Sequence, residues 1–458
     1  MKSTPRVAER PDGFDRKLLL PMVLGSILNP INTSILAVSL VPIGIALGAP
    51  PAQTAWLVSG LYVATAVGQP AMGRLIDLFG PRPLFLAGTA LTGLGGVLGV
   101  TAPSLWVLVL ARVILGLGTC AGYPAAMHLL RSEADRTGRP AQTSVMTVLA
   151  VANQTIAVIG PTLGGLLIHL GGWRTTFAIN IPLAVACLVV GALWLPKSRV
   201  APRTARAGLD VPGMVLFAGM LVALLLFLMK PQAAQWYSAA LAVVLLVALA
   251  GWEVRAASPF LDVRALASSV PLLVTYLRSL LTATVAYCFL YGFTQWLEEG
   301  RGLNPTVAGL MLLPMSLTAI GVSAITGRRN RIRSKLLVGS AGQLVACSLL
   351  LFMTPATPLW LPLVAALVMG VPQGLNTLAI QNAVYHQADP ARTASSAGLQ
   401  RTFFYLGAIG SAAASGSFLT PGSGAAGLHH LAWFMVAAAA LFFLVTVVDR
   451  SLRHLAVD

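Results

Sequence analysis

Long apolar runs constrain this chain more than any other feature. A helix needs about 20 apolar residues to cross the hydrocarbon core of a bilayer. By that measure fourteen spans are predicted, near residues 18–41, 53–72, 84–102, 105–127, 141–169, 174–196, 211–229, 235–253, 269–296, 305–326, 336–354, 358–381, 396–418 and 429–448. Only 10% of the residues are charged, whereas soluble proteins average about 25%. We therefore expect an all-α integral membrane protein with fourteen transmembrane helices, the first of which is not a cleaved signal peptide.

The basic residues indicate how the chain is oriented. If the N-terminus lies inside, the outer loops hold only Arg174, Lys230 and Arg301, whereas inner segments such as 1–17 and 328–335 are rich in Lys and Arg. This bias is the positive-inside pattern of membrane proteins. We therefore expect a multi-pass protein of the cell membrane with both termini in the cytoplasm. The net charge of +16 follows from this topology and does not imply a nucleic-acid partner.

The order of the spans predicts two halves. Residues 197–209 form a basic linker, poor in large apolar side chains, that follows Pro196. We expect a first six-helix bundle at 1–196, the linker with an inserted two-helix hairpin at 197–264, and a second six-helix bundle at 265–458. The two bundles echo each other weakly, as in transporters that bind substrate near the midplane between internal repeats.

A short loop is predicted between the second and third spans, in the run G-R-L-I-D-L-F-G-P-R that begins at Gly73. Gly73 and Gly80 permit a tight turn and a close approach of helices. Asp77 can cap a helix start or pair with Arg74 or Arg82. These residue types suit a compact loop between two membrane helices.

The predicted helix at 141–169 carries a stripe of small or polar residues. At 3.6 residues per turn, Asn153, Ala157, Gly160 and Gly164 lie on one face. Small residues at this spacing let helices pack closely in lipid, and Pro161 permits a kink. Simple helix packing and a moving element of a transporter both fit this pattern.

These stretches resemble signatures of the major facilitator superfamily. The loop is similar to G-x-L-x-D-x-x-G-x-[RK], with Pro81 in place of a basic residue, and Gly160–Gly165 is similar to the G-P-x-x-G-G core of an antiporter motif. The run from Trp173 to Pro182 and the hairpin beginning at Asp210 extend the likeness over nearly the whole chain. Together they look like the fourteen-helix drug–proton antiporter family, of the multidrug efflux type.

The resemblance implies the major facilitator fold: two six-helix bundles plus the inserted hairpin. It also implies export of amphipathic, often cationic compounds by alternating access, driven by inward proton movement. No cofactor is implied. The residues that the motifs assign to gating are Gly73, Asp77, Gly80, Arg82, Gly160, Pro161, Gly164 and Gly165.

Charged groups for proton coupling are few. Arg112 resembles the arginine of the family element R-x-x-Q-G-x-G, and an intramembrane arginine is costly, but snorkelling to the outer surface is the alternative. Asn32 stands where the family has an aspartate in the first helix, and an asparagine carries no proton. No Asp or Glu lies near the centre of a predicted span. The remaining candidate is Glu298, for which a solvated helix end is the alternative reading.

Polar side chains on the predicted helices are candidates for substrate binding. They form pairs or stripes at helical spacing, and they are Asn29, Asn32, Asn153, Gln154, Tyr287, Tyr291, Gln373 and Asn376. Amide and aromatic groups suit an amphipathic ligand. Each pair could instead form hydrogen bonds between helices. Arg278 lies on the opposite face from Tyr287, and a snorkelling or interhelical role is as plausible there as substrate contact.

The sequence argues against enzymatic chemistry. It contains no Ser/His/Asp set, phosphate-binding glycine loop or pair of histidines with metal-ligand spacing, so we expect no enzyme, metal or cofactor. The expected partners are the bilayer, a small-molecule substrate and protons, with the chain acting as a monomer. A uniporter, or an exporter of a neutral lipid-like or envelope metabolite, remains open because the first-helix aspartate is absent. A membrane receptor is disfavoured because the loops are short.

Overall fold

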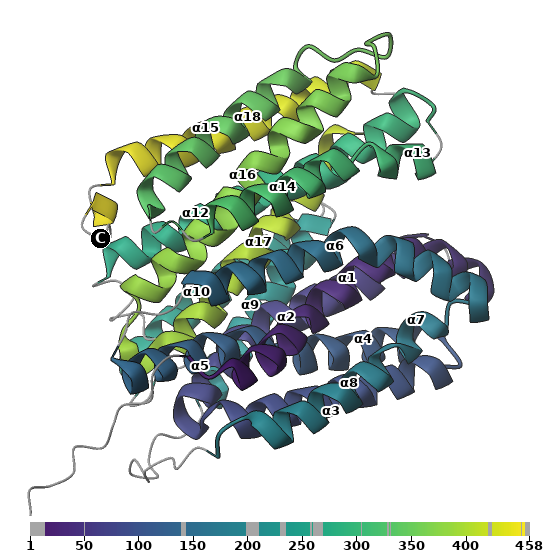
Figure 1. The fold of residues 1–458 in the computed structure, drawn as a ribbon. Coiled ribbons are helices and arrows are strands. Elements are labelled where there is room, and N and C mark those ends of the chain that lie inside the picture. The colour runs from purple at the N-terminus through teal and green to yellow at the C-terminus, as the bar shows by residue number, and fades with distance from the viewer. Residues whose placement is uncertain are drawn as a thin grey trace, which may run out of the picture.

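The computed structural model describes most of the chain. The described residues are 14–49, 51–138, 143–197, 210–229, 235–256, 259, 269–303, 305–327, 329, 331–419, 424–449 and 451–453. Every regular element within these ranges is helical (Figure 1). The predicted all-α class is therefore confirmed for the described part of the chain.

The helices of the first half follow the predicted runs closely. They are η1 (Arg16–Leu18), α1 (Leu19–Leu47), α2 (Pro51–Phe79), α3 (Pro81–Thr101), α4 (Leu105–Thr119), α5 (Gly122–Thr137), α6 (Thr143–Gly171), α7 (Thr175–Ala178) and α8 (Asn180–Trp194). α5 continues ten residues beyond the predicted end of its span at 127, because its last turns pack at the end of the bundle where the two halves meet.

The remaining helices include two wide π-helical stretches. In order they are α9 (Val211–Met229), α10 (Trp236–Arg255), α12 (Val270–Tyr287), η3 (Cys288–Phe293), η4 (Trp296–Gly300), α13 (Pro305–Leu310), α14 (Leu313–Thr326), α15 (Ile332–Leu350), α16 (Trp360–Gln387), η5 (Pro390–Arg392), α17 (Thr393–Phe418), α18 (Gly424–Val448) and η6 (Ser451–Arg453). η3 and η4 are the π-helical pieces; η3 follows α12 directly, and Thr294 and Gln295 separate it from η4. π-helical turns in membrane helices often mark functional positions.

Ten helical stretches of the described part are long and apolar enough to cross a membrane. They are Arg16–Leu36, Pro81–Thr101, Leu105–Thr137, Ser144–Gly171, Thr175–Trp194, Trp236–Arg255, Val270–Phe293, Val307–Thr326, Trp360–Gln387 and Gly424–Val448. Val38–Leu47 and Val211–Phe227 are shorter apolar helices. The count of fourteen spans stays a prediction.

Helix packing follows the same scheme in both halves. In the first half α1 packs on α6, α2 and α3 on α4, and α3 on α8. In the second half the corresponding pairs are α12 with α17, α14 and α15 with α16, and α15 with α18. α9 and α10 pack on each other, and α9 also contacts α2 and α17. The second half thus repeats the helix packing of the first. Parts of both predicted domain boundaries lie outside the described residues.

The two halves meet more closely at one end than at the other (Figure 1). α5 and α17 contact each other at the first end, whereas the ribbons spread apart toward α7 and α13. We call the first the basic end; it carries Asp77, Arg82, Arg131 and Arg392. Large apolar side chains such as Val244 on α10 are exposed along the helices, as lipid contact requires.

The predicted loop at 73–82 is shorter than expected. α2 continues through Phe79 and α3 begins at Pro81, so the turn is made by Gly80 alone. Gly80 has φ 85°, a conformation that glycine adopts without strain. Gly73 lies inside α2 and takes no part in the turn. Arg82 donates a hydrogen bond of 2.7 Å to the carbonyl oxygen of Ala192 on α8.

Candidate functional site

Asp77 joins the two halves at the basic end. Its carboxylate accepts hydrogen bonds from the backbone N–H groups of Ala394 at 3.2 Å and Ser395 at 2.9 Å, and from the Ser395 hydroxyl at 2.6 Å. Ala394 and Ser395 belong to the first turn of α17. His128 on α5 lies 3.4 Å from the same carboxylate through Nδ1. The sequence allowed either a helix cap or a pair with Arg74 or Arg82; Asp77 caps a helix, and that helix belongs to the other half.

Small residues bring α2 and α17 into close contact beside this cap. A Cβ added at Gly73 would overlap the carbonyl of Ala394, and one added at Gly398 would overlap the carbonyl of Gln69. Thr402 then donates a hydrogen bond of 2.7 Å to the carbonyl oxygen of Ala66. The backbones of α2 and α17 therefore touch over several turns, which only small or polar residues permit in a membrane.

α6 and α14 form the second contact between the halves. The Ser323 hydroxyl donates a hydrogen bond of 3.3 Å to Oε1 of Gln154. Nearer the basic end, a Cβ added at Gly327 would overlap the side chain of Thr147. Gln154, a predicted site residue, thus contacts the other half directly.

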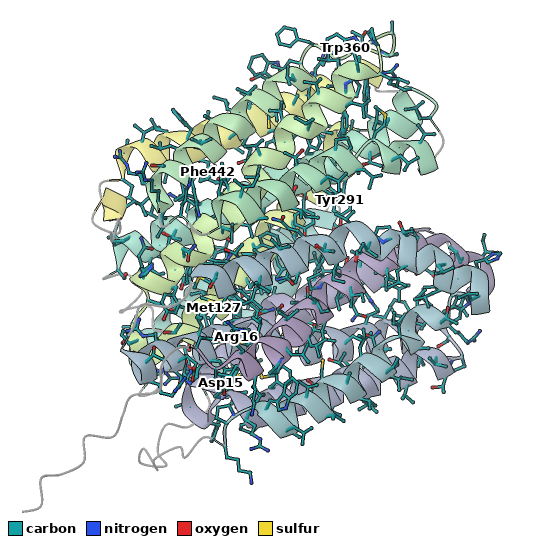
Figure 2. The ribbon with its side chains drawn as sticks, viewed as in Figure 1. Asp15, Arg16, Met127, Tyr291, Trp360 and Phe442 are labelled. Carbon is teal, nitrogen blue, oxygen red and sulfur yellow. The ribbon has the colours of Figure 1, made fainter. Side chains whose placement is uncertain are left out.

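Five aromatic residues from both halves form a cluster where these contacts end. The aromatic cluster consists of Tyr62, Tyr287, Tyr291, Phe404 and Tyr405. The hydroxyl groups of Tyr62 and Tyr291 lie 3.2 Å apart. The Tyr287 ring is 5.6 Å from that of Tyr291 and 5.7 Å from that of Phe404, and the Tyr62 and Tyr405 rings are 5.8 Å apart. Tyr291 is 40% exposed and lies between the two halves (Figure 2).

Asn29 on α1 is connected to the aromatic cluster. Tyr405 donates a hydrogen bond of 2.7 Å to Oδ1 of Asn29, and Nδ2 of Asn29 donates to Thr119 at 3.1 Å. The structure therefore brings three predicted residues, Asn29, Tyr287 and Tyr291, into one region. Sequence reasoning missed Tyr62 and Tyr405, although each is a polar aromatic residue in the middle of an apolar run.

Asn32 points elsewhere. Its Nδ2 donates hydrogen bonds to Oδ1 of Asn180 at 2.6 Å and to the carbonyl oxygen of Leu28 at 2.8 Å, so it joins α1 to α8 within the first half. Asn29 and Asn32 therefore have different partners in the structure, and a role of either in substrate binding stays a prediction. The two side chains point in different directions because residues three apart on a helix are still separated by about 60° around its axis.

Arg112 is buried in the first half and does not snorkel to the surface. It is 2% exposed. Both terminal nitrogens lie 3.2 Å from the carbonyl oxygen of Asn32, and Nε donates to the carbonyl oxygen of Leu57 at 3.3 Å. Arg112 thus ties α4 to α1 and α2 through backbone carbonyls, and none of the described residues forms an ion pair with it.

Three other predicted amides show different surroundings. Asn376 is fully buried and lies against Gly339 on α15, away from the first half, so it is not part of the aromatic cluster. Both amide atoms of Asn153 and of Asn376, and Oε1 of Gln373, are buried without a hydrogen-bond partner among the described residues. These side chains are polar groups that a ligand or water could satisfy.

The glycine stripe on α6 packs against α1. A Cβ added at Gly160 would overlap the Ser34 side chain, and one added at Gly164 would lie 2.7 Å from a methyl group of Val38. A Cβ at Gly165 would meet nothing within 4 Å. Pro161 lies inside α6, which continues through it. Gly160 and Gly164 therefore permit close packing, whereas Gly165 does not take part in it.

Arg401 on α17 is a further charged residue at this interface. Its Cζ lies 4.2 Å from the ring centre of Tyr123 on α5 and 5.8 Å from that of Phe404. A second pair, nearer the basic end, has the opposite arrangement: Arg131 on α5 lies 5.7 Å from the ring of Tyr385 on α16. Each half therefore supplies one arginine to an aromatic ring of the other half. No motif in the sequence pointed to Arg401.

Carboxylates within the described residues lie at helix ends. Asp77 and Glu133 are at the basic end, and Glu253 is buried near the end of α10. Asp449 accepts a hydrogen bond of 2.7 Å from Arg278, which is fully buried, so the role of Arg278 is interhelical. The backbone of Glu298 lies in η4, but its side chain is outside the described part. No metal-ligand cluster occurs among the described residues.

Comparison with known proteins gives a consistent result. The family model described as Major Facilitator Superfamily matches residues 22–412. The chain is 30% identical over 402 residues to the uncharacterized MFS-type transporter YwoD of Bacillus subtilis (strain 168), covering 85% of this chain and 87% of that protein. It is also 30% identical over 321 residues to the tetracenomycin C resistance and export protein of Streptomyces glaucescens, covering 68% of this chain and 57% of that protein.

The fold agrees with a solved structure. The human organic anion transporter MFSD10 (TETRAN) superposes with a TM-score of 0.67 at 17% sequence identity, covering 94% of this chain and 99% of that one. At this identity the likeness concerns the fold alone. The family model and the similarity to YwoD both span most of the chain. The chain therefore belongs to the major facilitator superfamily, a family of transporters and not of enzymes.

Proposed function

We propose that this protein exports amphipathic small molecules by alternating access. The observation that carries the proposal is the set of contacts that closes the molecule toward the basic end: Asp77 caps α17, and farther along the interface Gln154 meets Ser323 across the two halves. Such contacts can break as a unit when the halves rock, which is how transporters with internal repeats expose a central site to each side in turn. The resemblance to a resistance and export protein supports the outward direction.

The proposal includes the finer family assignment and its topology. We assign the chain to the fourteen-helix drug–proton antiporters, with bundles at 1–196 and 265–458, the hairpin α9–α10 between them, and both termini in the cytoplasm. The packing of α9 against α10, α2 and α17 supports an inserted hairpin beside the bundles. On this orientation the basic end faces the cytoplasm, and the structure corresponds to the state closed on that side.

Proton coupling is part of the proposal, with Glu298 as the candidate for carrying the proton. In everted vesicles with an acidic lumen, tetracenomycin C should accumulate in the lumen, and collapse of the pH gradient should abolish accumulation. Glu298→Gln should abolish the gradient dependence, while the adjacent Glu299→Gln is the matched control. Flux that ignores the gradient in the wild-type protein would argue against antiport.

A second candidate is uniport, or export of a neutral lipid-like metabolite. Asn32 occupies the position of the family's aspartate and is bonded to Asn180. The described residues place no carboxylate in the middle of a helix at the interface. A neutral substrate needs no counter-charge there, so this candidate predicts downhill flux without a pH gradient.

A further inference from the structure

We propose that Arg401 and the aromatic cluster form a binding site for compounds that combine an aromatic body with an anionic group. This inference rests on the proposed transport function and names its substrate class. It departs from the expectation of cationic substrates, which the family resemblance implied.

The first observation is the state of the Arg401 guanidinium. Among the described residues it makes no hydrogen bond and no ion pair; its contacts are the rings of Tyr123 and Phe404. Its Nε is buried without a hydrogen-bond partner among the described residues, whereas the residue as a whole is only half-buried. A guanidinium has five N–H donors in a planar fork that matches a carboxylate. Arg401 is therefore held in place by stacking while its donors remain available.

Arg112 provides an internal contrast. Its guanidinium is also at the interior of the protein, but all three nitrogens donate to the carbonyl oxygens of Asn32 and Leu57. Arg278 likewise has a carboxylate partner in Asp449. Intramembrane arginines are costly unless their donors are satisfied. Of these three, Arg401 alone lacks such a partner in the described part of the chain, which is the property expected of a ligand-binding group.

The second observation is the composition of the surroundings. Phe404 touches both Arg401 and Tyr287, and through Tyr287 the cluster continues to Tyr291, which is partly exposed between the halves. Flat rings next to a cation offer apolar area for an aromatic ligand and a charge for its acidic group. An organic cation would meet the like charge of Arg401, and no described carboxylate forms an ion pair with that guanidinium.

The location also connects binding to the transport cycle. Tyr123 and Arg401 belong to opposite halves, so opening of the basic end separates the guanidinium from the Tyr123 ring. A bound carboxylate can then replace that ring as the partner of the cation. The ligand thereby interacts differently with the two states, which a transported substrate must do to shift the equilibrium between them.

The test is equilibrium binding to the purified full-length protein in nanodiscs, measured by fluorescence anisotropy. The probes are fluorescein, which is anionic at pH 7.5, and rhodamine 123, a cation with the same xanthene ring system. We expect the wild-type protein to bind fluorescein at least tenfold more tightly than rhodamine 123. Equal affinity, or a preference for rhodamine 123, would overturn the proposal.

Variants separate charge from packing. Arg401→Gln should weaken fluorescein binding at least tenfold and leave rhodamine 123 binding unchanged or stronger. Arg401→Lys should bind fluorescein more tightly than Arg401→Gln but less tightly than the wild-type protein, because it keeps the charge and loses the planar fork. The matched control is Arg174→Gln, because Arg174 stacks on Trp173 at 4.3 Å but donates hydrogen bonds to the carbonyl oxygens of Val100 and Ala102 within the first half. If Arg401→Gln fails to fold, the relative affinities of the wild-type protein and of Arg401→Lys for the two probes still test the proposal. If Arg401→Lys weakens the binding of fluorescein and of rhodamine 123 to the same extent, Arg401 has a structural role and the proposed site is refuted.

Binding is measured without transport, so the two proposals fail separately. Selective fluorescein binding without accumulation in vesicles would leave the site intact and refute export. Gradient-driven export of tetracenomycin C without any preference for fluorescein would support export and refute the anion site.

Discussion

Replacing Asp77 with alanine should open the basic end. Asp77 accepts three hydrogen bonds from the first turn of α17, and its side chain is only 4% exposed. Loss of a helix cap costs about 0.5–2 kcal/mol. Loss of a partly buried negative charge at a helix N-terminus costs up to ~2 kcal/mol more. Because these groups lie on opposite halves, the loss falls on the closed state and not on either half alone.

The expected shift is therefore about 0.5–4 kcal/mol toward the state open at the basic end, or roughly 2- to 700-fold in the equilibrium constant. Asp77→Asn keeps one acceptor oxygen and loses the charge, so we expect about half of this free-energy change. The two variants together distinguish the hydrogen bonds from the charge.

The assay is pulsed electron–electron double resonance, which measures the distance between two spin labels. The labels are placed on exposed residues at the basic end, Ser132 on α5 and Ala391 in η5. Asp77→Ala should add a population with a longer distance. Asp135→Ala is the control, because Asp135 is an acid at the same end of the molecule, on α5, but is 67% exposed and, among the described residues, pairs with Arg131 of its own helix at 3.6 Å. An unchanged distance distribution in Asp77→Ala would refute the view that this carboxylate holds the halves together.

Three further predictions follow from other contacts. Gly160→Leu should abolish export while the protein still inserts, because the side chain would enter α1, whereas Gly165→Leu should retain export because its Cβ faces open space; vesicle flux measures both. Arg278→Met should lower the stability by about 2–4 kcal/mol in thermal unfolding, somewhat less than loss of a fully buried pair, because Asp449 is 12% exposed. Burial raises the pKa of Asp449, but hydrogen bonds from Ser451 and Arg278 outweigh burial and hold that pKa below its usual value. The stabilisation is therefore fully present above the unfolded-state pKa of Asp449 and is lost as the pH falls through its folded-state pKa. A reporter fused at residue 205 should remain inside the cell, and an external reporter would refute the orientation.

The sequence determined the class of the protein and the position of most helices. The length and hydrophobicity of each run decide the class and the helix positions locally, because each membrane helix satisfies its own backbone hydrogen bonds. The motif around Gly160 also predicted close helix packing, since a glycine stripe has few other uses in an apolar helix. The sequence did not show which helix the glycine stripe packs against, because any helix face without large protruding side chains could pack there.

Only the tertiary structure decided the partners of the polar residues. Asn29 and Asn32 look equivalent in sequence, yet Asn29 meets Tyr405 from 376 residues away and Asn32 meets Asn180. Asp77 was readable as a cap, but the capped turn at Ser395 lies 318 residues further along the chain. A side chain reaches only a few ångströms, whereas its partner is chosen by how whole helices assemble. Chain order alone therefore could not reveal that Arg401 lies between Tyr123 and Phe404 with donors still available.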